Sequence, residues 1–113
     1  METLLVITTL PDAAHAQALA TALVEARLAA CVNILAPCRS VYRWQGQIED
    51  ATEVPLLIKT TVERYAELEV EIRRLHPYEL PEIIAVPIER GLPDYLDWIG
   101  LETRAEIIPT AQQ

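Results

Sequence analysis

The sequence predicts an α+β fold of the ferredoxin-like βαββαβ type, an antiparallel sandwich with an additional short C-terminal helix. Two observations lead to this prediction. Short runs rich in leucine and β-branched residues alternate with helical patterns, in the order strand, helix, two strands, helix, strand. In addition, 113 residues, of which 51% are hydrophobic, are enough for one continuous core. We therefore expect a single domain over residues 1–113.

The first strand is expected over residues 3–9, TLLVITT, because this run alternates too little for a solvated face and is followed by Pro11. A helix follows from Asp12, which is a favourable N-cap residue. Its apolar residues recur at intervals of three and four: Ala16, Leu19, Ala20, Leu23 and Leu28. Residues 31–36, CVNILA, are expected to form the second strand.

Residues 39–59 have the pattern of a long β-hairpin, with the turn at Gln45-Gly46 because glycine tolerates a left-handed backbone. Pro55 lies in the returning arm of this hairpin. Proline cannot donate a hydrogen bond to a neighbouring strand. We therefore expect the hairpin either to lie at a sheet edge or to be irregular near its middle.

The second helix is expected to open with a capping box at Thr60 and Glu63 and to end before Pro77. A strand, EIIAVPIE, follows at residues 82–89. A short helix, YLDWI, closed by Gly100, precedes a last extended piece at residues 104–108.

Helices that cover one face of such a sheet leave its other face bare. The apolar runs LLVI, LLI and IIAV predict that the bare face is hydrophobic. Large exposed apolar patches are rare on monomers, so we expect another subunit to cover this face.

The charge balance disfavours several classes of partner. Nine basic and seventeen acidic side chains give a net charge of −8, which repels nucleic acid. No apolar run reaches the roughly eighteen residues of a membrane span. The N-terminal sequence METLLVITTLPD is unlike a signal peptide, because an acidic residue and a Pro-Asp pair come early. We expect a cytoplasmic protein with no nucleic-acid or membrane partner.

Cys31 and Cys38 are the two cysteines, and their spacing fits neither a zinc knuckle nor a redox Cys-x-x-Cys motif. If residues 31–38 are extended, the two side chains point to opposite faces and lie roughly 23 Å apart. We expect both thiols to stay reduced and unbridged. Cys31 is most simply a small buried hydrophobic residue.

The stretch RLHPYELPEI, residues 74–83, is the first candidate site. The imidazole of His76 is a ligand for Cu(II), Zn(II) or Ni(II), and Glu82 can offer an oxygen across a loop that two prolines restrain. The alternative is structural: a positive charge at a helix end and a loop carboxylate. Two ligands are too few for a tight site within one chain.

Catalysis and aromatic recognition are the other candidates. His76, Tyr78, Glu79, Glu82 and Lys59 are potential acid and base groups, but no nucleophile elbow, phosphate loop or Cys-His signal accompanies them. We therefore expect no enzyme activity and no organic cofactor. The aromatic residues either line a small-molecule cleft or pack an interface, and we favour the interface. They are Tyr42, Trp44, Tyr78, Tyr95 and Trp98.

Five motifs together resemble the CutA divalent-cation tolerance proteins, in the right order and spacing over about residues 3–101. The motifs are AACVN, YRWQGQIE, LIKTT, HPYELPEI and DYLDWI. The resemblance implies a ferredoxin-like subunit in a tight, PII-like homotrimer, whose long hairpins contribute to intersubunit sheets. It also implies a link to copper and other divalent-cation tolerance.

The resemblance further implies site residues. Metal-associated positions are His76 and Glu82, with Cys31 as a weaker candidate. Positions implied for an intersubunit cleft are Trp44, Glu49, Lys59, Tyr78, Tyr95 and Trp98. The sequence departs from certain bacterial members at Thr8 and Leu75, where those proteins carry Cys and His.

We therefore expect a trimeric protein that binds divalent cations, Cu(II) foremost, weakly and without catalysis. Two alternatives remain open at this point: a signalling module that binds a small molecule in an intersubunit cleft, and a purely structural trimer.

Overall fold

The computed structural model describes residues 2–105, and its element order confirms the predicted fold. The strands are β1 (Thr3–Leu10), β2 (Cys31–Ile34), β3 (Cys38–Trp44), β4 (Gln47–Thr61) and β5 (Ile84–Pro87). The helices are α1 (Ala13–Glu25), α2 (Val62–Leu75) and α3 (Pro93–Glu102). Asp12 is the N-cap of α1 as expected, and its carboxylate accepts a hydrogen bond from the backbone N–H of His15.

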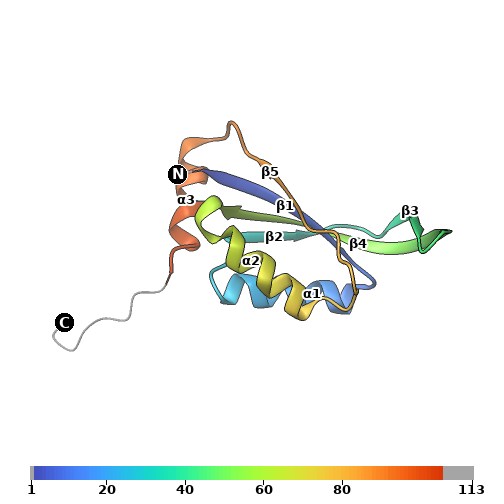
Figure 1. Cartoon of the computed structure of the whole chain (residues 1–113). Coiled ribbons are helices and arrows are strands. Elements are labelled where there is room, and N and C mark those ends of the chain that lie inside the picture. Colours follow the sequence, from blue (N-terminus) through green and yellow to red (C-terminus); the bar gives the residue numbers. More distant parts are fainter. Residues whose placement is uncertain (1, 106–113) are drawn as a thin grey trace, which may run out of the picture.

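The sheet is antiparallel, with the strand order β2-β4-β1-β5, and β3 pairs with the first half of β4. The hairpin of β3 and β4 projects beyond the two-layer body (Figure 1). Gln45 and Gly46 form its turn, with φ angles of 49° and 80°. Two successive left-handed residues are typical of the tight turn whose twist matches that of the strands.

Pro55 does not lie in an edge strand, because β4 is central and has neighbours on both sides. The second expectation, an irregular hairpin, is the correct one. The carbonyl of Pro55 accepts the N–H of Leu35 at 3.0 Å, in the gap where the chain passes from β2 to β3. A residue's N–H and C=O point to the same side of a strand. The backbone N–H that Pro55 lacks would therefore point toward residues 35–37, where no strand pairs with β4 on that side.

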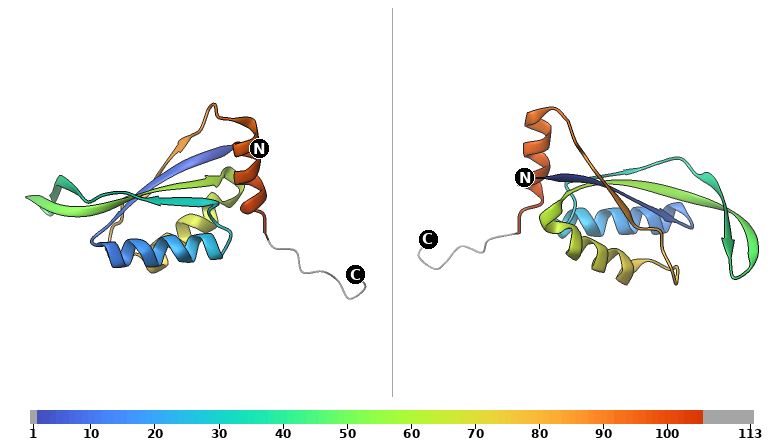
Figure 2. Two further views of the ribbon diagram at one scale, coloured as in Figure 1. Left: turned by 180° about the vertical axis from the view of Figure 1, so that it is seen from behind. Right: turned by 45° about the horizontal axis from the view of Figure 1, so that its top comes forward.

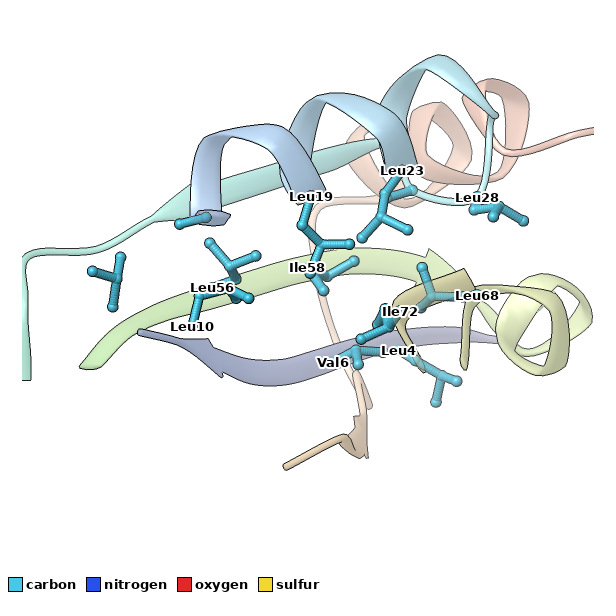
Figure 3. Close-up of a cluster of buried hydrophobic side chains, with 13 residues drawn as sticks. Leu4, Val6, Leu10, Leu19, Leu23, Leu28, Leu56, Ile58, Leu68 and Ile72 are labelled. Carbon is cyan, nitrogen blue, oxygen red and sulfur yellow. The ribbon is translucent and has the colours of Figure 1, made fainter. Parts of the chain in front are cut away.

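The core lies between the sheet and helices α1 and α2, which cover one face (Figures 1 and 2). Alternate residues of β1 and β4 point into it, among them Val6, Leu56 and Ile58, and all three are fully buried. Leu23 from α1 and Ile72 from α2 meet them from the helix layer (Figure 3). Each strand therefore sends every second side chain to the helices.

The opposite face of the sheet is apolar and partly open, as the sequence predicts. Leu5, Ile7 and Leu57 are half-buried on it, and Ile84 and Val86 of β5 are exposed. Helix α3 crosses one end of the sheet on this side (Figure 2) and contacts β1 and β4. The middle of the face has no cover within residues 2–105. We call this surface the open face.

Two expected helix boundaries are wrong. Thr60 does not begin a capping box, because it is a buried residue of β4 whose hydroxyl donates to the carbonyl of Leu28 at 2.7 Å. The N-cap of α2 is Thr61, and its side chain makes no capping hydrogen bond. Helix α3 continues through Gly100 to Glu102. The extended piece expected at residues 104–108 lies largely outside the described residues.

Cys31 and Cys38 are both free. Cys31 pairs opposite Lys59 and Cys38 opposite Glu53, six residues away along β4. By this register the two cysteines lie on the same side of β4, so the expectation of opposite faces is wrong. The reason is that residues 35–37 leave the strand. A separation of six residues still corresponds to about 20 Å, which is too far for a disulfide.

Replacing Ile72 by alanine should lower the free energy of unfolding by about 2–5 kcal/mol, because the side chain is fully buried against the sheet. Val70→Ala on the same helix is the matched control. Val70 is 66% exposed, so its change should stay within about 0.5 kcal/mol. Urea unfolding at one fixed protein concentration measures both. Equal effects of the two substitutions would contradict the assigned inner face of α2.

Candidate functional site

The candidate residues form three separate clusters within one chain. His76 and Tyr78 lie at the corner between α2 and β5. Lys59, Cys31, Tyr95 and Trp98 gather where β2 and β4 meet α3. Trp44 and Glu49 lie on the projecting hairpin.

His76 is the C-cap of α2, and the proline that follows it favours its extended backbone, with ψ at 135°. The ring is 8% exposed and both of its nitrogens have partners. Nε2 lies 2.7 Å from the carbonyl oxygen of Thr9, and Nδ1 lies 3.1 Å from the backbone N–H of Tyr78. A carbonyl can only accept and a backbone N–H can only donate. The arrangement therefore selects a neutral imidazole with its hydrogen on Nε2.

Glu53 completes the corner cluster and was missed by sequence reasoning. Its carboxylate is buried and accepts a hydrogen bond from the hydroxyl of Thr9 at 3.2 Å. Burial, together with Glu53, raises the pKa of Tyr78 to about 12. Burial lowers the pKa of His76, while the Thr9 carbonyl and Glu53 partly oppose that shift. The only sequence signal for Glu53 was a carboxylate next to an apolar strand run, which is usually solvated.

The three metal candidates do not form one cluster within a single chain. Glu82 is exposed beyond the corner, and Cys31 belongs to the α3 cluster. Neither ring nitrogen of His76 has a free lone pair while its two hydrogen bonds are made. Within residues 2–105, no group of three or more His, Cys, Asp or Glu side chains has an arrangement that could hold a metal ion. A tight metal centre therefore does not fit the geometry of a single chain.

The α3 cluster lies beside the open face. The ammonium of Lys59 hydrogen-bonds the side-chain oxygen of Asn33 and lies 4.0 Å from the sulfur of Cys31. Burial and the neighbouring Cys31 raise the pKa of Tyr95. The rings of Tyr95 and Trp98 are 5.5 Å apart. A cation, a phenol and an indole next to apolar strands can bind either an aromatic or anionic small molecule or a second protein surface.

The hairpin presents its candidates to solvent. Trp44 pairs with Gln47 at the turn, and Glu49 pairs with Tyr42. A two-point ion pair between Arg39 and Asp50, with one N···O distance of 3.1 Å, joins the two arms. Trp44 and Glu49 are thus held on an ordered projection, and Tyr42, which pairs with Glu49, lies near enough to the corner to help raise the pKa of Tyr78.

Comparison with known proteins gives a consistent result. The profile of the "CutA1 divalent ion tolerance protein" family matches residues 4–102. The Thermus thermophilus divalent-cation tolerance protein CutA is 47% identical over 98 residues, which are 87% of this chain and 95% of that protein.

Solved structures similar to this chain are also CutA proteins. CutA from Xylella fastidiosa has a TM-score of 0.89 at 44% identity and covers 92% of this chain and 100% of its own. The Archaeoglobus fulgidus protein, described as periplasmic, has a TM-score of 0.87 at 42% identity, with coverages of 90% and 99%.

Stability should fall as the pH is lowered from about 7.5 to about 5.5, because burial gives folded His76 a pKa below its ordinary value of 6.5. The unfolded chain then takes up a proton at a higher pH than the folded chain does. The stabilisation is therefore present above the unfolded pKa and is lost as the pH falls from there through the lower folded pKa. The carboxyl groups of Asp12 and Glu71 have lowered pKa values and act only at lower pH.

Urea unfolding at both pH values measures this decline. His76→Gln keeps an N–H donor for the Thr9 carbonyl but does not titrate, so its decline should be shallower. His15→Gln is the matched control, since that ring is half-exposed and, among residues 2–105, its hydrogen-bond partner is Asp12. An unchanged decline in His76→Gln would show that the corner does not set the pH dependence.

Proposed function

Because this chain belongs to the CutA1 divalent ion tolerance family, a family named for tolerance and not for catalysis, we propose that it acts in divalent-cation tolerance as a homotrimer. We further propose that it contacts Cu(II) or another divalent ion weakly and catalyses no reaction. The trimer is supported by the apolar open face and by the hairpin that projects beyond the body of the chain. A closed cyclic assembly covers this face equally in every subunit.

The weak metal contact is assigned to the corner. His76 and Glu82 supply an imidazole and a carboxylate, the pair for which Cu(II) is favoured among divalent ions. His76 must give up one of its two internal hydrogen bonds before a ring nitrogen can bind an ion. This competition supports weak binding rather than tight binding. Cys31 lies in the α3 cluster, so within one chain it is not a partner of this pair.

A second candidate function rests on the α3 cluster. Lys59 is a cation on the apolar open face, next to Tyr95 and Trp98. In a trimer, Trp44 and Glu49 on a neighbouring hairpin and Tyr78 from a corner would be available to complete an intersubunit cleft. Such a cleft would suit a small molecule with an anionic group and a flat ring. On this alternative, the protein would be a signalling module.

The compartment is a separate proposal. Within residues 2–105, none of the helices is both long enough and apolar enough to traverse a bilayer. Two unpaired cysteines, each partly accessible, support a reducing compartment. We therefore propose a cytoplasmic location for this chain.

The trimer is tested by placing a charge on the open face. Ile84→Glu should dissociate the assembly, because Ile84 is half-exposed in β5 and a buried unpaired carboxylate is costly. The unsubstituted protein should sediment at three times the mass of one chain at micromolar concentration. Val70→Glu, on the outer side of α2, is the control and should stay trimeric. A monomeric unsubstituted protein would refute the proposed assembly.

Calorimetric titration with Cu(II) tests the metal contact. His76→Gln should abolish the weak heat of binding, and binding to the unsubstituted protein should decline below about pH 6 as the imidazole takes up a proton. The chain has two histidines, so His15→Gln is the matched control and should retain binding. Loss of binding in His15→Gln alone would move the contact to the start of α1. Retained Cu(II) binding in both variants would exclude histidine as the metal ligand.

A further inference from the structure

A cavity of about 580 Å³ lies between the first turn of α2 and the last turn of α3. Its volume falls within the range of roughly 300–1,000 Å³ that is usual for small-molecule sites. Asp97 and Leu101 of α3 and Arg104, which follows the helix, line it on one side. None of the residues of the α3 cluster lines it, although Leu101 follows Trp98 by about one helical turn. The cavity is therefore distinct from the α3 cluster and from the open face.

One end of the cavity is suited to an anionic group. Thr61, the N-cap of α2, lines it and is 3% exposed. Its hydroxyl neither caps the helix nor has another hydrogen-bond partner within residues 2–105. The hydroxyl oxygen itself is not fully enclosed, so it is accessible to water and equally to a ligand in the cavity. The first-turn N–H groups of Glu63 and Arg64 have no intrahelical acceptor, and the helix dipole favours negative charge there.

The arginines on the wall have different roles. Arg64 is already engaged, since it donates to Glu67 at 2.9 Å and to the carbonyl of Arg27 at 3.3 Å. Arg104 is exposed and has no ion-pair partner within the described part of the chain. Arg104 can therefore swing onto a bound oxyanion, while Arg64 contributes only its charge.

The same cavity carries negative charge. Glu63 and Asp97 line it and are exposed, and neither has an ion-pair partner among residues 2–105. The two carboxylates and the net charge of −8 disfavour a simple polyanion such as phosphate. They favour a ligand that carries a positive group close to its negative one. Leu101 adds an apolar wall.

We propose that this cavity binds a small aliphatic α-amino acid. Its carboxylate lies at the first turn of α2, against the hydroxyl of Thr61 and the guanidinium of Arg104. Its ammonium lies between Asp97 and Glu63, and its side chain packs on Leu101. Every charged group of the wall is then matched, and the unused hydroxyl of Thr61 gains a partner. The site needs no metal ion and is independent of the tolerance function proposed above.

Calorimetric titration of the full chain with L-leucine tests the ligand class. Leucine should bind saturably, whereas 4-methylpentanoate, which lacks the ammonium, and 3-methylbutylamine, which lacks the carboxylate, should each bind at least about tenfold more weakly. Binding of 4-methylpentanoate or of inorganic phosphate as tight as that of leucine would overturn the zwitterion assignment. Absence of saturable leucine binding up to about 10 mM would overturn the site.

Substitutions locate the binding. Thr61→Val, Arg104→Gln and Asp97→Asn should each weaken leucine binding by at least about fivefold, because each removes one polar contact. Asp94→Asn, on the same helix but outside the cavity, and Arg90→Gln are the matched controls and should leave binding unchanged. The exposed Asp97 keeps the test valid if Thr61→Val impairs folding. Equal loss in Asp94→Asn and Asp97→Asn would show a non-specific charge effect and refute the site.

Discussion

The antiparallel pairing of β4 with β1 is the interaction on which the rest of the structure depends. Eight consecutive residue pairs, from Thr3 opposite Thr61 to Leu10 opposite Val54, fix the register. A slip of one residue would turn every side chain to the other face. This register sends Leu56 to the helices and leaves Leu57 on the open face. It also positions the three clusters, because β4 extends from the hairpin turn to the start of α2.

The corner shows how the fold limits the chemistry of a residue. His76 connects the end of α2 to the last residues of strand β1 through the carbonyl of Thr9, and it holds the following loop through the N–H of Tyr78. Both ring nitrogens are used in these two hydrogen bonds. An imidazole that supports the fold in this way offers a lone pair only when the fold loosens. The structural and metal interpretations of RLHPYELPEI are therefore competing uses of the same two atoms.

The candidate polar groups of this chain are distributed around the molecule and are not gathered in one pocket. The α3 cluster opens toward the bare sheet face, the hairpin carries its aromatic residue outward, and the cavity at Thr61 lies between the start of α2 and the end of α3. The protein thus combines a two-layer body with candidate groups at its surface.

The sequence by itself determined the order of the elements, the apolar second face and the turn at Gln45-Gly46, because periodicity and glycine chemistry are local properties. The recurring motifs were also enough to indicate the family. Only the tertiary structure decided that Pro55 lies in a central strand opposite a break, since that depends on which strands become neighbours. Only the tertiary structure brought Glu53 and Thr9 to His76, across 23 and 67 residues of sequence. Hydrogen bonds between segments so far apart in sequence leave no periodic pattern in the sequence. They decide whether a histidine is free to bind a metal ion or is held in the fold by its hydrogen bonds.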